Sequence, residues 1–173
     1  SKPSNLTVVK APGNTLDKIL SEAGSMRTKG KFSSVWCLFG LDDVGATLED
    51  VDASKAIAEK KKVKMLYFAP SFYLYFALFE TCPKRVADTE TLKRRVQVSF
   101  PDFELSSRYF LTSGLNVNFK IYPKIAEADQ NARDYNVISE MDTGFAATTL
   151  PLFLDDLKTV LGKADMSQAR NRF

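Results

Sequence analysis

The sequence predicts a single α+β domain built on a mostly antiparallel twisted sheet with two to three packed helices. Three observations lead to this fold class. The chain of 173 residues has the length of one domain, its 45% of hydrophobic residues can fill one core, and segments with helix-capping residues are interspersed with short apolar runs. We expect the domain to span residues 14–162, between a flexible arm at 1–13 and a flexible tail at 163–173.

Capping residues delimit three expected helices. The first covers residues 14–24, between an Asn N-cap and a Gly that ends the helix. The second is expected at about 52–62, after Thr47 and Asp50, whose spacing resembles a capping box. The third covers about 150–161, with Thr149 as its cap and Gly162 at its end.

Apolar runs predict the strands. The clearest is residues 115–122, where apolar residues alternate strictly with polar ones. Further strands are expected at 32–41, 63–69, 72–80, 92–100 and 135–141, separated by turns and by a polar loop at 123–134. A helix stays open for 72–80, because short apolar runs fit both periods.

The composition argues against familiar catalytic machinery. The chain has no histidine, which excludes Ser-His-Asp and Cys-His catalysis and histidine metal ligands. It also lacks the glycine-rich phosphate-binding motifs. We therefore expect a non-enzymatic protein with no cofactor, no metal and no small-molecule substrate. Acid-rich runs at 42–43, 49–52 and 155–156 leave a cation site or acid-base chemistry open, although a turn, a helix start and a solvated helix face explain them.

Two cysteines and the termini bear on location. Cys37 and Cys82 are far apart in the sequence and indicate reduced thiols, and the sequence does not say whether they meet in space. The start at Ser1 has no apolar core of a secretory signal, and it suggests a nearly complete chain without its initiator methionine. We expect a protein that is neither secreted nor transmembrane.

Basic clusters are the candidate binding residues. Although the net charge is only +3, several cations are adjacent in sequence and could contact the phosphates of nucleic acid or anionic lipid. An ordinary solvated surface is the alternative, because 21 acidic residues are spread through the chain. The linker adds Arg27, Lys29 and Lys31. The predicted polyanion-binding residues are Lys60, Lys61, Lys62, Lys64, Lys84, Arg85, Lys93, Arg94 and Arg95.

An aromatic run is the candidate self-association surface. If residues 72–80 form a strand, both of its faces are apolar, and the second face needs a helix or a partner chain. Tyr73, Tyr75 and Phe79 share that second face and are the predicted contact residues between copies of the chain. A place in the core is the alternative, and the more common one for such residues.

The order of elements resembles the matrix proteins of rhabdoviruses. A short arm, the strand at 31–38, the helix near 52–62, the strand after Lys64 and the alternating segment at 114–122 follow in a similar order. The chain lacks a Pro-Pro-x-Tyr motif and a lysine-rich arm, which suits a plant-infecting relative better. The resemblance implies a homo-oligomer that bridges viral ribonucleoprotein to an anionic membrane, in the host cytoplasm or virion.

Two other functions stay open on the same residues. The first is a nucleic-acid-binding module such as a viral silencing suppressor or movement factor, with Lys93, Arg94 and Arg95 among its contacts. The second is an acid-dependent hydrolase or metal enzyme that uses the paired carboxylates.

Overall fold

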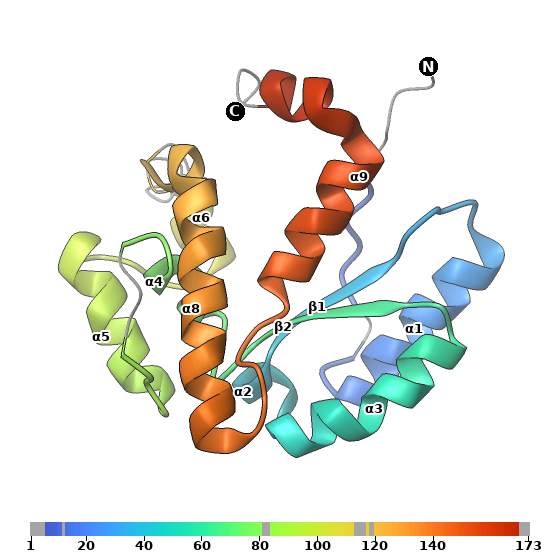
Figure 1. Cartoon of the computed structure of the whole chain (residues 1–173), viewed down its shortest axis with the longest axis horizontal. Coiled ribbons are helices and arrows are strands. Elements are labelled where there is room, and N and C mark those ends of the chain that lie inside the picture. Colours follow the sequence, from blue (N-terminus) through green and yellow to red (C-terminus); the bar gives the residue numbers. More distant parts are fainter. Residues whose placement is uncertain (1–5, 12, 81–83, 113–116, 118–119, 170–173) are drawn as a thin grey trace.

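The structure, a computed structural model, is predominantly helical around one short parallel pair of strands (Figure 1). It describes residues 6–11, 13–80, 84–112, 117 and 120–169. The elements in chain order are α1 (Leu16–Lys29), β1 (Trp36–Gly40), α2 (Leu41–Val44), α3 (Leu48–Lys60), β2 (Lys64–Phe68), α4 (Tyr73–Ala77), α5 (Thr89–Ser99), α6 (Ser107–Thr112), a 3₁₀ turn η1 (Tyr122–Lys124), α8 (Ile125–Thr143) and α9 (Leu150–Ala169).

The strands β1 and β2 form a β-α-β unit. They run parallel in a register from Trp36 opposite Lys64 to Gly40 opposite Phe68, with α2 and α3 in the connection between them. The capping box expected at the start of α3 is present: the amide of Asp50 donates to the Thr47 hydroxyl at 3.2 Å, and the amide of Thr47 donates to the Asp50 carboxylate at 2.9 Å.

The outer edge of β2 is satisfied by the segment between α8 and α9. Phe68 forms an antiparallel bridge with Thr148, and the amide of Ala69 donates to the carbonyl of Ala147 at 2.8 Å. The Thr149 hydroxyl donates to the carbonyl of Met65 at 2.6 Å and accepts from the amide of Tyr67 at 3.3 Å. Thr149 was expected to cap α9, and its side chain instead binds the strand edge.

Asn136 of α8 supports this segment from its other side. Its side-chain oxygen accepts from the amides of Ala147 at 2.9 Å and Thr148 at 3.1 Å, and its side-chain nitrogen donates to the carbonyl of Thr148 at 2.8 Å. One amide side chain thus supplies the hydrogen bonds that a neighbouring strand would otherwise make.

The predicted antiparallel sheet is wrong, and it is corrected to eight α-helices around a two-stranded parallel sheet within the described part of the chain. Runs predicted as strands place buried residues four apart, as a helix does: Leu92 and Val96 in α5, Tyr135 and Ser139 in α8.

The same spacing overturns the clearest strand prediction. In segment 115–122, Val117, Lys120 and Ile121 are helical, while 115, 116, 118 and 119 lie outside the described residues. Val117 and Ile121 are buried and four apart, so they satisfy a helical period as well as the alternation. The run at 72–80 contains α4, which was the alternative left open, and the predicted loop at 123–134 lies mostly in α8.

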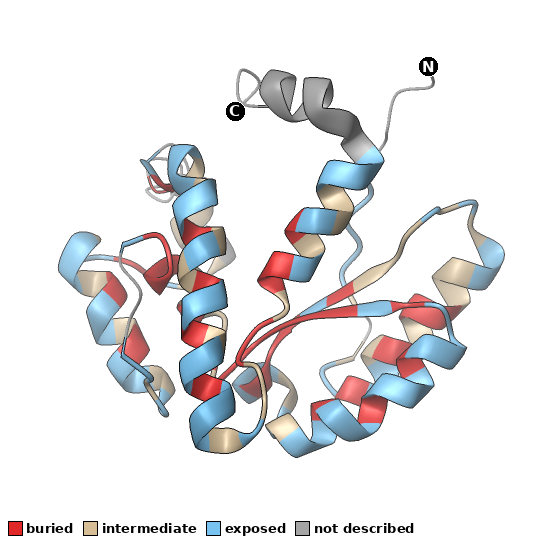
Figure 2. Ribbon diagram, viewed as in Figure 1, coloured by how far each residue is buried: buried red, intermediate tan, exposed pale blue. Residues whose placement is uncertain are grey.

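The termini of the helices differ from the predictions. Thr15 and not Asn14 is the N-cap of α1, and α3 begins at Leu48 instead of near residue 52. α1 continues through Gly24, which is buried beside the Lys61 side chain, to Lys29. α9 continues past Gly162 to Ala169. Figure 2 shows that the buried residues gather along the strands and on the inward sides of the surrounding helices. The largest fully buried side chains include Phe68, Phe79, Phe103 and Tyr135.

We predict that Asn136→Ala lowers the free energy of unfolding by about 2–3 kcal/mol, because it leaves polar groups of the buried residues Ala147 and Thr148 without partners. Urea unfolding measures the effect. The control is Gln130→Ala, which removes an exposed amide of the same helix that contacts Asp134 and should change the value by no more than about 0.5 kcal/mol. Equal values for the two variants would contradict the proposed role of Asn136.

Candidate functional site

Five cations line one groove where the carboxyl-terminal ends of two helices meet. Arg27 and Lys29 belong to α1, Lys60 ends α3, and Lys61 and Lys62 form the turn after it. The volume of the groove is about 660 Å³. Among the described residues that form this basic groove, none is acidic. The lysines are exposed and Arg27 is half-buried, so their charges face water.

Local structure explains why these cations converge. Gly24 has no side chain, and a Cβ there would lie 3.1 Å from the Lys61 side chain, which shows how closely that lysine packs on α1. After α3, Lys62 adopts a positive φ of 56°, and the amide of Val63 donates to the carbonyl of Ala58 at 3.0 Å. The chain therefore turns sharply into β2 and leaves Lys60, Lys61 and Lys62 around the opening.

The charges in the basic groove are not neutralised by neighbouring acids. Within the described part of the chain, its five cations form no ion pair, whereas Lys55 pairs with Asp52 at 3.1 Å and Lys64 with Asp156 at 3.4 Å. The carbonyl ends of α1 and α3 favour cations, which is a structural reason for lysine here. Because a helix end carries about half a unit charge, five cations leave a net positive groove.

A second groove adjoins the basic groove. It lies between α3 and α9 over the first residues of β2, has a volume of about 810 Å³, and is lined largely by apolar groups, among them Trp36, Met65, Leu152 and Val160. We call it the α3–α9 groove. Arg27 and Lys62 line both grooves, so the two are continuous.

Asp156 organises the wall of the α3–α9 groove. Its carboxylate accepts from the indole nitrogen of Trp36 at 2.7 Å and from the Ser34 hydroxyl at 2.8 Å, and it pairs with Lys64. Burial raises the pKa of Asp156, but the hydrogen bonds from Trp36 and Ser34 and the charge of Lys64 together lower it below its ordinary value of 3.8. The Lys64 ammonium also lies 5.4 Å from the Trp36 ring centroid.

The predicted cations lie in four places: the two adjoining grooves, the segment before α5, and α5 itself. Lys60, Lys61 and Lys62 come together in the basic groove, and Lys64 lies in the adjoining one. Sequence reasoning noted Arg27 and Lys29 as linker cations and did not group them with these lysines. No local sequence pattern indicates that the carboxyl-terminal ends of α1 and α3, which are separated by β1, lie close together in space.

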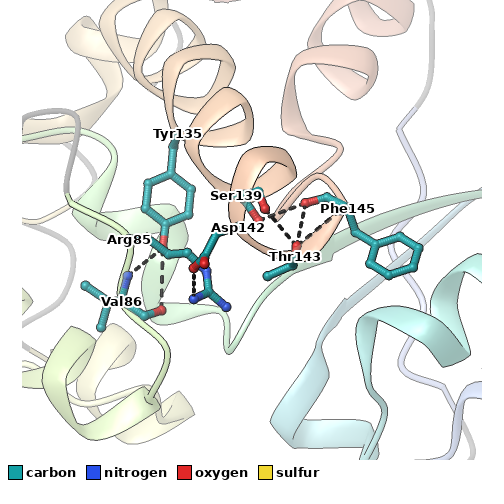
Figure 3. Close-up of polar contacts among 7 residues, drawn as sticks. All are labelled: Arg85, Val86, Tyr135, Ser139, Asp142, Thr143 and Phe145. Atoms are coloured by element: carbon teal, nitrogen blue, oxygen red, sulfur yellow. Dashed lines mark hydrogen bonds and ion pairs between the residues drawn. The ribbon is translucent and has the colours of Figure 1, made fainter.

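Lys84 and Arg85 lie elsewhere, in the segment before α5, and Figure 3 shows Arg85. Arg85 forms an ion pair with Asp142 near the end of α8, so its charge is already matched. The amide of Val86 donates to the Tyr135 hydroxyl at 3.0 Å, and the Ser139 hydroxyl donates to the carbonyl of Phe145 at 2.8 Å. The contacts of Arg85 and Val86 hold the segment before α5 against α8.

Lys93, Arg94 and Arg95 lie on α5, which Figure 1 places at the opposite end of the molecule from α1 and α3. Arg94 pairs with Glu90 at 3.5 Å on the same helix. The α5 cations therefore form a separate surface and do not extend the basic groove.

The predicted self-association residues lie in an aromatic cluster. Phe79 is buried, while Tyr73 and Tyr75 are half-buried. Tyr75 has its ring centroid 4.9 Å from that of Phe79, and Tyr73 contacts Phe103 with centroids 5.9 Å apart. Burial and the neighbouring Tyr122 raise the pKa of Tyr75 to about 12. These side chains pack within the molecule and present no flat exposed patch.

Among the described residues, no group of three or more acids and cysteines could hold a metal ion. Asp42 accepts from the Thr89 hydroxyl, and Asp50 belongs to the capping box. Asp155 pairs with Arg133 at 3.3 Å. Cys37 is buried, which raises the pKa of its thiol to about 11, and Cys82 lies outside the described residues.

No family model, curated protein or solved structure matches this chain. In the part of the chain that the structure describes, none of the helices has the length and apolar character needed to span a bilayer.

We predict that Asp156→Asn destabilises the protein by about 1–3 kcal/mol at pH 7, because it weakens the hydrogen bonds to Trp36 and Ser34 and removes the ion pair with Lys64. The pKa of Asp156 is lower in the folded state. Its contribution to the free energy of unfolding is thus complete above the pKa of the unfolded state and is lost as the pH falls through the pKa of the folded state. The difference in the free energy of unfolding between Asp156→Asn and wild type, measured in urea, should be smaller at pH 3 than at pH 7. The adjacent Asp155→Asn, at an exposed acid, should have a smaller effect.

Proposed function

We propose that this protein binds the phosphate backbone of nucleic acid through its basic groove and carries out no chemical reaction. The observation that carries the proposal is the convergence of five cations without ion pairs from α1 and α3 around one opening that no acid lines, among the described residues. Phosphate contacts supply most of the affinity in sequence-independent binding. The absence of histidine from the chain agrees with a binding role.

The shape of the site favours nucleic acid over a membrane surface. The cations line a recess, and the opening continues into the α3–α9 groove. A planar layer of lipid head groups contacts protruding or flat surfaces, whereas a flexible polyanion can follow a groove along its length. We therefore favour nucleic acid as the ligand of the basic groove.

We predict that replacing Lys60, Lys61 and Lys62 together by Gln weakens binding of a single-stranded oligonucleotide about 100-fold at roughly 0.1 M salt. Each lost phosphate contact on a single strand makes the slope of log K against log salt less steep by about 0.7. Three lost contacts therefore lower log K by about 2 at this salt concentration. Fluorescence anisotropy across a salt series measures both quantities.

The matched control removes the same charge from α5, with Lys93, Arg94 and Arg95 replaced by Gln. We expect this variant to bind nearly as wild type does. If the α5 variant loses as much affinity as the basic-groove variant, net charge explains the binding and the groove is not the site. Equal affinity of wild type for anionic vesicles would also contradict the assignment to nucleic acid.

We propose as a second candidate the assembly role that the resemblance to matrix proteins implied, in which copies associate and link nucleoprotein to an anionic membrane. The observation in its favour is the segment before α1. Leu6 is 81% exposed and Val8 is 86% exposed, although both are apolar. Exposed apolar side chains this close together are typical of contact surfaces between proteins.

We predict that the double variant Leu6→Ser, Val8→Ser suppresses a concentration-dependent rise in sedimentation coefficient that wild type shows. The control is Val98→Ser, Met141→Ser, two side chains with nearly equal exposure of 82% and 85% on other helices. It should sediment as wild type does. A wild-type protein that stays monomeric at high concentration and low salt, and does not pellet with anionic vesicles, would rule out this second candidate.

A further inference from the structure

We propose that the α3–α9 groove binds the bases of the strand whose phosphates occupy the basic groove, which makes the combined site specific for single-stranded nucleic acid. This inference rests on the proposed function and names its substrate class. A duplex keeps its bases paired inside the helix, so they cannot enter a side groove.

The basic groove opens directly into the α3–α9 groove. Arg27 and Lys62 line both, so a phosphate held by these cations lies next to the mostly apolar recess. A nucleotide combines those two features, a negative charge and a flat apolar ring, within one unit. The volume of about 810 Å³ lies within the range of roughly 300–1,000 Å³ that is usual for small-molecule sites.

Trp36 is held in place by two side chains of α9. Asp156 holds its indole nitrogen at 2.7 Å, and Phe153 packs edge-on with ring centroids 5.3 Å apart. The ring is therefore oriented before a ligand arrives, and binding requires little additional ordering of this side chain. Aromatic rings in such a setting stack with bases of any sequence.

Leu152, in the first turn of α9, is a second apolar residue of the recess. It is 60% exposed despite being apolar, and it lines the α3–α9 groove. A base bound in the α3–α9 groove would cover it. Because Leu152 is exposed, it can be changed without disturbing the core.

The test uses the emission of Trp36, which is the single tryptophan of the chain. Full-length protein is titrated with a single-stranded 12-mer, with the same sequence as a duplex, and with inorganic polyphosphate, which has no bases. We expect the single strand to quench Trp36 saturably. Polyphosphate should compete for the basic groove in an anisotropy assay and leave the emission unchanged.

The variant Leu152→Gln removes apolar contact at constant charge and should weaken binding of the single strand by roughly five- to tenfold, with polyphosphate binding unchanged. The control Val98→Gln changes an equally apolar exposed residue on α5 and should have no effect. If single strand and duplex bind equally, Trp36 does not respond and Leu152→Gln binds as wild type, this inference is wrong while the phosphate site stands. If neither nucleic acid nor polyphosphate binds, the proposed function is wrong as well.

Discussion

The outer edge of β2 must find hydrogen-bond partners, and most of the arrangement around the grooves depends on how it does so. A two-stranded parallel sheet leaves each strand with one unpaired edge, and buried backbone groups without partners are costly. Here the segment before α9 pairs with that edge, and Asn136 supports the segment from α8. The start of α9 is thereby fixed relative to β2, and with it the position of Asp156 opposite Trp36.

The β-α-β connection determines where the basic groove lies. α1 precedes β1 and α3 precedes β2, and both helices end near the beginning of the strand that follows. Because the two strands are parallel, these two helix ends lie at the same end of the sheet. The cations that favour helix carboxyl ends therefore meet, although they come from separate parts of the sequence.

Parts of this structure could be predicted from sequence because local chemistry determines them. The capping box of Thr47 and Asp50 marks α3, and the apolar runs at 32–41 and 63–69 contain β1 and β2. The remaining strands were mistaken because residues such as Val117 and Ile121 fit both periods, and tertiary packing decided between them. Lys60 to Lys62 could be identified as a cluster, but their grouping with Arg27 and Lys29 depends on topology, which no local pattern encodes.

Gly24 shows how an uncharged position can govern an electrostatic surface. The absence of a side chain there lets the stem of Lys61 lie against α1, and an added Cβ would lie 3.1 Å from it. A larger residue at this position would therefore displace the Lys61 side chain from α1. Where this ammonium group stands in the groove thus depends on a position that carries no charge itself.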